Sequence, residues 1–395
     1  DRLVAAIDEQ GKIEKAYESV PLSTVSRREE IEKNLPEAPD FTGDKGIKLE
    51  DVANNRATLA GFTAQLEDVE LEALCRGDYV MNSKLGTPGN AAVYGGILKS
   101  LRKKGVPPVS ATDGPSGIRL HCYASLLPIG TLLASTWNQQ LVRELYAAEG
   151  AEMARKGSDV LLAPGMNIHR DPLCGRNFEY YSECGVLSGL TAAAEVSGAT
   201  ENGLICYVKH FAFNDQDNYR QNNICTWLNE QSAREIYLKA FEQPIKAGGM
   251  GVMTSMNAVG PVWAGGCKAL LTNILRDEWG FHGAVITDAV VSAWYMDGNL
   301  AIRTGGTKML AFNITNEFYR DLNSVGTVTA MRNAAHGTLY ALANSFAVTR
   351  AVAVPKWVKT TYAVDAVVAI ILVAWEICAI CKYRKAKKED EDTEQ

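Results

Sequence analysis

Between residues 47 and 348, short apolar runs alternate with helix-like patterns, and this alternation constrains the fold more than any other feature. The apolar runs span residues 106–112, 159–164, 204–208, 251–254 and 284–287. Helix-like patterns accompany them at residues 60–75, 139–156, 187–201, 230–247 and 268–279. Strands that alternate with helices predict a parallel sheet with helical crossovers. A stretch of about 300 residues favours an α/β fold of the (β/α)8 TIM-like barrel type, which we assign to residues 47–350. Periodicity alone does not exclude the alternative of a doubly wound sheet.

Composition and charge exclude several classes of protein. The chain has 395 residues, of which 47% are apolar, and a formal net charge of −6, so a disordered chain is excluded. The 46 acidic and 40 basic residues leave no basic excess for nucleic acid. Nine cysteines are scattered without zinc-type spacing, and no GxGxxG follows a strand. We therefore expect reduced thiols, no metal, no cofactor and no nucleic-acid partner.

The first 46 residues are polar and predict an N-terminal helical linker. Helix-like runs cover residues 1–20 and 26–35, and a Pro/Gly-rich stretch closes the segment at residues 36–46. The chain begins at Asp1 with no signal-peptide pattern, so we expect either a trimmed N-terminus or a piece of a longer protein.

The C-terminal end contains an apolar segment long enough to span a membrane. Residues 362–381 are almost wholly apolar apart from Asp365 and Glu376, and 20 residues are enough to cross the hydrocarbon core. A basic cluster follows at residues 382–388. Positive charge stays on the cytoplasmic side, so residues 382–395 are predicted as a cytoplasmic tail and the barrel as extracytoplasmic. A buried or amphipathic helix of a soluble protein is the alternative.

Polar residues follow the predicted strands where active sites of such barrels lie. Acidic, basic and amide groups occur at these positions, among them Asp113, Asn167, Lys209, His210 and Asp288. Carboxylates accept hydrogen bonds from sugar hydroxyls, while Lys, Arg and His donate to them. A carboxylate at a strand end could also attack an anomeric carbon, as in retaining glycosidases. The spacing alone does not say which acid does so.

Five ordered motifs resemble glycoside hydrolase family 3, the family of exo-acting β-glucosidases and their relatives. They are TDGPSG (residues 112–117), LAPGMNIHRDPLCGRNFEYYSE (162–183), VKHFAFN (208–214), AREIYLKAFE (233–242) and LRDEWGFHGAVITD (275–288). The resemblance covers about three quarters of the chain, and five motifs in one order are highly specific.

The resemblance implies a role for each matching residue. Asp288 matches the nucleophile, and Asp113 matches the acid that holds the far-side hydroxyls of the sugar. Arg176, Lys209 and His210 match the cluster that binds the remaining hydroxyls. Structural roles are the alternatives: Asp288 as a helix N-cap, Asp113 as a turn former, Arg176 in a surface ion pair and His210 in the core.

The sequence also departs from the family pattern. Met256 occupies the substrate-binding position of a tyrosine that commonly helps to orient the nucleophile, and Ala289 replaces a tryptophan wall that Trp294 could restore. Asp217 stands where glutamate is commoner, and Cys184 where aspartate is usual. These changes put rate and leaving-group preference in doubt more than sugar binding.

The resemblance implies an acid/base carboxylate on a separate α/β sandwich domain. About 45 residues follow residue 350, too few for such a domain. Residues 42–49 and 334–347 resemble the barrel ends of members with the sandwich domain first. We therefore expect the barrel half of a permuted enzyme, with the acid/base domain missing from this chain.

The sequence favours a retaining exo-β-glycosidase of the β-glucosidase class, acting on β-linked oligosaccharides or aryl β-glucosides. The alternative is a membrane-anchored, non-catalytic sugar-binding barrel. An aldolase-like or isomerase barrel would need a Schiff-base lysine or a metal set, and Lys209 is better explained by its motif.

Overall fold

The structure, a computed structural model, describes residues 2–19, 25–35, 37, 40–78, 80–290, 294–311, 322, 324–349 and 356–393. The chain divides into two units, residues 1–349 and residues 350–395. Each unit is described separately below.

A seven-stranded sheet forms the centre of the first unit. Its order is β12-β11-β8-β6-β5-β4-β3, and every neighbouring pair is parallel except β3 and β4. The strands are β3 (Ala92–Gly95), β4 (Pro108–Asp113), β5 (Val160–Leu162), β6 (Ile205–Phe211), β8 (Gly251–Thr254), β11 (Ala284–Val290) and β12 (Lys308–Ala311). The Lys308 Nζ atom lies 3.4 Å from the centroid of the Tyr94 ring, so side chains of the two edge strands meet. The sheet is thus a nearly closed barrel.

The barrel differs from the predicted (β/α)8 pattern. Seven strands rather than eight belong to this sheet within the described ranges, and β3 runs antiparallel to the others. The five predicted strands correspond to β4, β5, β6, β8 and β11. A small second sheet joins β7 (Cys225–Thr226), β9 (Ala258–Val259) and β10 (Val262–Trp263).

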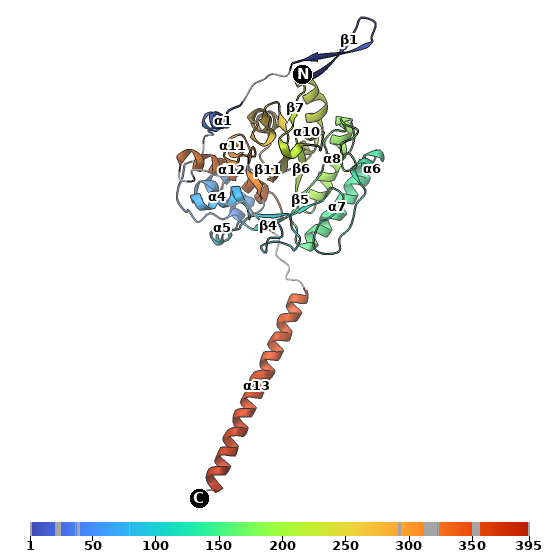
Figure 1. Ribbon diagram of the computed structural model, residues 1–395. Coiled ribbons are helices and arrows are strands. Elements are labelled where there is room, and N and C mark those ends of the chain that lie inside the picture. The colour runs from blue at the N-terminus through green and yellow to red at the C-terminus, as the bar shows by residue number, and fades with distance from the viewer. Residues whose placement is uncertain are drawn as a thin grey trace. The chain divides into compact units, whose positions relative to one another are not determined.

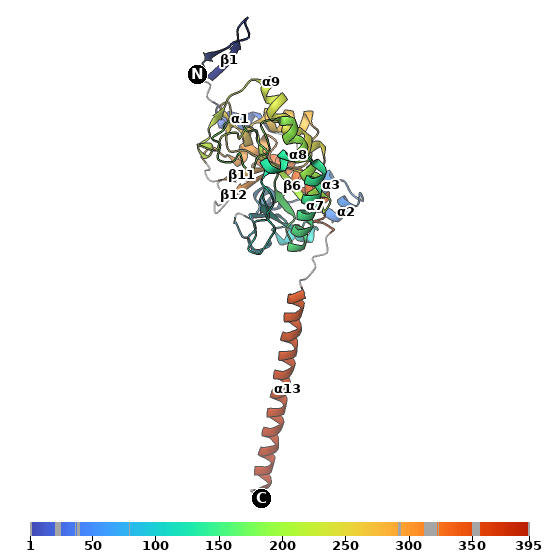
Figure 2. The same cartoon turned by 90° about the vertical axis from the view of Figure 1, so that its right-hand side faces the viewer.

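Helices surround the sheet, with α7 and α8 on one side and α4 and α12 on the other (Figure 1). Figure 2 looks onto the side that α7 and α8 cover. The α-helices described in this unit are α1 (Arg27–Lys33), α2 (Leu49–Ala53), α3 (Leu59–Ala64), α4 (Asp68–Arg76), α5 (Lys99–Lys103), α6 (Gly130–Ser135), α7 (Gln139–Lys156), α8 (Gly185–Thr200), α9 (Glu230–Ser232), α10 (Lys239–Lys246), α11 (Gly298–Arg303) and α12 (Val325–Ala343). The described part of this unit also contains the π-helices η2 (Ala233–Leu238) and η4 (Ala269–Glu278) and the 3-10 turns η1 (Arg220–Asn222) and η3 (Ala264–Gly266).

Strand β6 shows how the core is divided. All seven of its residues are buried, which explains its continuous apolar run. Ile205 and Tyr207 pack in a cluster with residues of α4 and α12, whereas Cys206 and Val208 pack with residues of α7 and α8. Alternate residues of a strand point to opposite faces, so β6 is covered on both faces. This burial fixes the position of its polar end.

The N-terminal segment corrects one prediction. Within residues 1–20, which were predicted as helix, residues 2–18 form a hairpin of β1 (Arg2–Ile7) and β2 (Ile13–Glu18). The Asp8 carboxylate accepts hydrogen bonds from the amides of Gln10 and Lys12, and Gly11 has φ +78°. This turn chemistry closes a hairpin and interrupts a helix. The second predicted helix is confirmed as α1 (Arg27–Lys33), which Ser26 caps.

The second unit contains helix α13 (Lys356–Thr393). Its segment Thr360–Ala386 is long and apolar enough to cross a bilayer, and none of it is buried in the protein. The segment contains the predicted span of residues 362–381.

Two glutamates are buried between α7 and α8. Glu195 accepts a hydrogen bond from the Tyr181 hydroxyl, while neither carboxyl oxygen of Glu149 has a hydrogen-bond partner within the described residues. Burial, followed by repulsion from Glu195, raises the pKa of Glu149 to about 9. Burial raises the pKa of Glu195 to about 8. Both carboxyls are therefore protonated in the folded protein at neutral pH.

Replacing Glu149 with Gln is expected to stabilise the protein increasingly as the pH rises. The folded pKa lies above the unfolded one, so the wild-type chain loses stability from about pH 5 to about pH 9. We expect the variant to gain at least about 1 kcal/mol over the wild type between pH 5 and pH 8 in urea unfolding. The matched control is Glu144→Gln, at an exposed position of the same helix. A gain that does not change with pH would contradict this account.

Candidate active site

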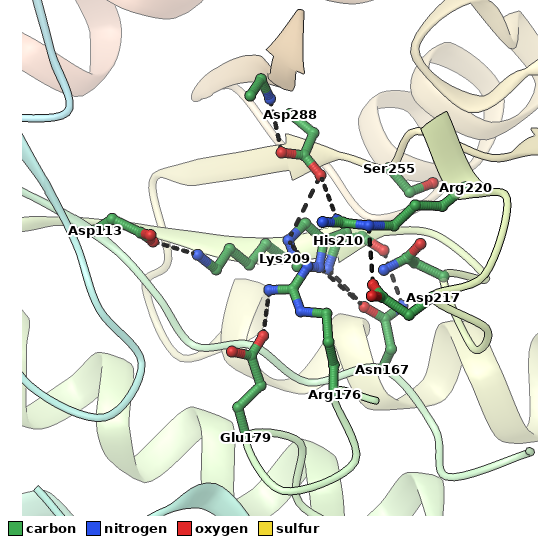
Figure 3. Close-up of polar contacts among 12 residues, drawn as sticks. Asp113, Asn167, Arg176, Glu179, Lys209, His210, Asp217, Arg220, Ser255 and Asp288 are labelled. Carbon is green, nitrogen blue, oxygen red and sulfur yellow. Dashed lines mark hydrogen bonds and ion pairs between the residues drawn. The ribbon is translucent and has the colours of Figure 1, made fainter. Parts of the chain in front are cut away.

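The sheet order brings the predicted site residues to one end of the strands. Asp113 is the last residue of β4, Lys209 and His210 lie near the end of β6, and Asp288 lies in β11. The carboxyl ends of parallel strands meet at the same edge, where barrel active sites lie. An ion pair joins Asp113 to Lys209, and a second set of contacts joins Arg176 to His210 and His210 to Asp288 (Figure 3). These neighbouring groups are called the binding network below.

A partly buried ion pair joins β6 to β4. The Lys209 Nζ atom lies 2.6 Å from Asp113 Oδ1, and Arg119 Nη1 lies 3.1 Å from Asp113 Oδ2. Burial opposes ionisation of Asp113, but the charge and hydrogen bond of Lys209 outweigh it and lower the pKa of the carboxyl. Asp113 is therefore an ionised acceptor, and its role as a mere turn former is not supported.

Asn167 and Tyr180 hold His210. The His210 amide donates to Asn167 Oδ1 at 2.8 Å, and Asn167 Nδ2 donates to the His210 carbonyl at 2.9 Å. Burial and the cations Arg176 and Lys209 lower the pKa of His210, so the imidazole is neutral. Arg176 Nη1 lies 3.2 Å from Nε2, and because Arg can only donate, Nε2 accepts. The other ring nitrogen then carries the proton and faces the Tyr180 hydroxyl at 3.3 Å.

Arg176 lies on the loop after β5, where it forms an ion pair with Glu179 and stacks over the Tyr180 ring at 5.6 Å. Most of both side chains is buried, so the surface ion pair considered from the sequence is wrong. The guanidinium is held between the Glu179 carboxylate and His210, and it faces the centre of the site (Figure 3).

Asp288 has one carboxyl oxygen that accepts no hydrogen bond from the described residues. Its Oδ1 accepts a hydrogen bond from the Ala289 amide at 2.6 Å, while Oδ2 has no hydrogen-bond partner in the part of the chain that the structure describes. The side chain is only 12% exposed. Burial raises its pKa, against the charges of Arg220, Arg176 and Lys209 and the Ala289 hydrogen bond. Asp297, not Asp288, caps the next helix, α11, so the N-cap alternative is wrong.

Met256 lies two residues beyond β8 and is buried. Its neighbour Ser255 donates a hydrogen bond to the Ala212 carbonyl at 2.9 Å. A methionine side chain supplies no hydroxyl to Asp288. Trp294 is more than half exposed and packs edge-on against Tyr295.

Arg220 was not singled out from the sequence. Its Nη1 lies 3.6 Å from Asp288 Oδ2, and its Nε lies 2.9 Å from Asp217 Oδ1. The sequence does show an acid and a base three residues apart in the polar loop after β6, which is typical of a local ion pair. This spacing does not predict that Arg220 lies close to Asp288 on β11.

No group of three or more His, Cys, Asp or Glu side chains in the described ranges is arranged to hold a metal ion. The site instead combines the ion pairs Asp113–Lys209, Glu179–Arg176 and Asp217–Arg220 with a neutral imidazole and an Asp288 oxygen that has no hydrogen-bond partner among the described residues. This combination suits hydrogen bonding to a polyhydroxylated ligand and attack by the carboxylate.

The chain is similar to proteins of known family. The profile described as "Glycosyl hydrolase family 3 N terminal domain" matches residues 90–303. A β-glucosidase of Ruminococcus albus is 45% identical over 276 residues, which are 69% of this chain and 29% of that protein. β-Glucosidase A of Butyrivibrio fibrisolvens is 40% identical over 61% of this chain and 28% of its own length. The chain thus spans less than a third of these relatives.

Solved structures show the same similarity. A β-glucosidase from Paenibacillus barengoltzii has a TM-score of 0.77 and 38% identity, with 90% of this chain and 40% of that chain covered. β-Glucosidase 3B of Thermotoga neapolitana, solved in complex with α-D-glucose, has a TM-score of 0.65 and 29% identity, with 74% and 43% covered. With its profile matched over more than half of its length, this chain belongs to glycosyl hydrolase family 3.

Proposed function

We propose that the chain is the nucleophile-bearing part of a retaining exo-β-glucosidase. It would remove terminal non-reducing β-D-glucosyl residues from oligosaccharides or aryl glucosides by double displacement. The observation that carries the proposal is Asp288, a buried carboxylate whose free oxygen adjoins a network of sugar-type donors and acceptors. The relatives named β-glucosidases support the substrate class.

The network would bind the sugar without rearranging its charges. Asp113 would accept hydrogen bonds from two hydroxyls, and Lys209, Arg176 and the His210 ring would contact the others. The ion pairs already hold these groups in place. Preorganised polar groups are most effective when their interactions strengthen in the transition state.

Asp288 Oδ2 would attack the anomeric carbon with its electron pair. The bond from that carbon to the leaving-group oxygen breaks, and a general acid protonates the departing oxygen. Water, deprotonated by the same group, then cleaves the glycosyl ester, and the product retains its configuration.

We assign the acid/base to a domain outside this sequence. The other carboxylates labelled around Asp288 in Figure 3 each have a cationic partner: Asp113 has Lys209, Glu179 has Arg176, and Asp217 has Arg220. Burial raises the pKa of Asp215 to about 7, but this side chain is enclosed and its charged neighbour is Arg170. A general acid must reach the leaving oxygen, so Asp215 does not suit the role.

We also propose that α13 anchors the protein in a membrane. The basic residues 382–388 would keep the tail cytoplasmic and the barrel extracytoplasmic. Asp365 and Glu376 lie toward the two ends of the predicted span. A charge costs up to about 3 kcal/mol at the bilayer centre and less near the headgroups.

The trapping experiment uses a 2-deoxy-2-fluoro-β-glucoside with a dinitrophenolate leaving group, which needs no acid catalyst. We expect intact mass to show one covalent adduct on the wild-type chain and none on Asp288→Asn. Asp277→Asn, at an exposed aspartate, is the matched control and should label like the wild type. A folded wild-type chain that never labels would favour the non-catalytic sugar-binding barrel.

Lys209→Met is expected to weaken sugar binding. A hydrogen bond to a charged group contributes about 1.5–3 kcal/mol, so calorimetry with a glucose-configured iminosugar should show a roughly ten- to hundredfold higher Kd. Lys239→Met, which removes a partly exposed lysine of α10, should bind like the wild type. Equal affinity of the Lys209 variant and the wild type would remove Lys209 from the proposed subsite.

The membrane proposal predicts that the full chain sediments with membranes after carbonate extraction, and that a chain ending at residue 355 does not. In intact cells, external protease should digest the barrel and spare an epitope placed after residue 395. Digestion of the epitope by external protease would show that the topology is the reverse of the one proposed. Release of the full chain by carbonate would contradict the membrane anchor.

A further inference from the structure

Arg220 is a cation that the binding network does not use. It approaches Asp288 from the side opposite Asp113, and Asp217 contacts it from behind (Figure 3). The Arg220 Nη1 atom is 3.6 Å from Asp288 Oδ2, and its side chain is only 21% exposed.

The loop that carries Arg220 is tied to the barrel. The Arg220 carbonyl accepts a hydrogen bond from the Tyr295 hydroxyl at 3.4 Å. Tyr295 is buried and packs edge-on against Trp263, whose indole donates to the Ser255 carbonyl at 3.0 Å. These contacts link the loop to the end of β8, so Arg220 has a fixed position beside β11.

Four other charged or titratable groups act on Asp288, namely Lys209, Arg176, His210 and Tyr295. Lys209 pairs with Asp113, and Arg176 pairs with Glu179. His210 is neutral, and burial raises the pKa of Tyr295 to about 12, so it is neutral too. Of the cations, Arg220 does most to offset the burial of Asp288.

We infer that Asp217 and Arg220 form a positioning pair for the nucleophile, in which Arg220 holds the Asp288 carboxyl group in place and Asp217 limits how strongly Arg220 binds it. The inference deepens the proposed function and rests on it. When Asp288 Oδ2 bonds to the anomeric carbon, the electron pair of the broken bond leaves with the departing oxygen and Asp288 loses its charge. A lone arginine would then be buried without a partner, at a substantial cost. Asp217 neutralises it, so the pair remains satisfied in the covalent intermediate.

The pair makes opposite predictions for its two members. Arg220→Met removes the nearest positive charge, so the pKa of Asp288 should rise by at least about 1 unit. Asp217→Asn leaves Arg220 free to pair with Asp288, so that pKa should fall. Arg220→Lys should lie between the wild type and Arg220→Met. A purely structural role for the loop would not produce shifts of opposite sign.

The test is an NMR titration of the full chain, labelled with 13C-aspartate and dissolved in detergent, in which the carboxyl carbon signals are followed with pH. The Asp288 signal is assigned as the one that is lost in Asp288→Asn. Arg234→Met, at an exposed ion pair with Glu278, is the matched control and should leave the titration unchanged. Circular dichroism confirms that each variant is folded. An unchanged pKa in Arg220→Met, or shifts of the same sign in both variants, would overturn the pair.

Trapping kinetics separate this inference from the proposed function. We expect Arg220→Met to label about tenfold more slowly at neutral pH, with the acid limb of its profile moved to higher pH. Asp217→Asn should label more slowly with its acid limb moved to lower pH. If the fluoroglucoside never labels the wild-type chain, the proposed function is wrong, and the titration still shows whether Asp217 and Arg220 act as a pair on Asp288. If Arg220→Met labels like the wild type, the pair alone fails.

Discussion

The Lys209 ammonium lies at the end of a strand that is buried along its whole length, and the site is organised around this charge. A buried ammonium without a partner is costly, and Asp113 supplies a carboxylate at 2.6 Å. Asp113 can do so because β4, β5 and β6 are adjacent and parallel, with Asp113 opposite Leu162. Sheet order and register are therefore conditions for the ion pair, and the pair in turn fixes two groups that suit sugar hydroxyls.

The same charges determine the state of the neighbouring groups. Lys209 and Arg176, together with burial, keep His210 neutral, so its ring can accept from Arg176. Arg176 is engaged by Glu179, which leaves the charge of Asp288 balanced chiefly by Arg220. Within the described residues, Asp288 Oδ2 has no hydrogen-bond partner although Arg220 lies 3.6 Å from it, and the proposed reaction uses this oxygen. This is the pattern expected when a site is preorganised for a charge that the reaction consumes.

Local patterns in the sequence were sufficient to predict much of the fold, but they did not predict β3, the N-terminal hairpin or the position of Arg220. Five strands and the residues at their ends were predictable because buried parallel strands are continuous apolar runs. Strand β3 (Ala92–Gly95) was missed because four residues among glycines and prolines carry no periodic signal, and its pairing with β4 is a tertiary event. The hairpin at residues 2–18 was missed because a turn at Asp8–Lys12 outweighed helix-like composition. Arg220 was missed because its approach to Asp288 depends on loop residues with positive φ, including Tyr219.

A crystal structure of the full chain with β-D-glucose tests the central claim most directly, because it locates the sugar relative to each group at once. The account predicts that the anomeric carbon lies about 3–3.5 Å from Asp288 Oδ2, within attacking distance. It also predicts that hydroxyl groups of the glucose form hydrogen bonds with Asp113 and Lys209, and that Arg220 remains paired with Asp217. Glucose bound with its anomeric carbon turned away from Asp288, or bound elsewhere on the barrel, would contradict the assignment of this network as a glucosidase subsite.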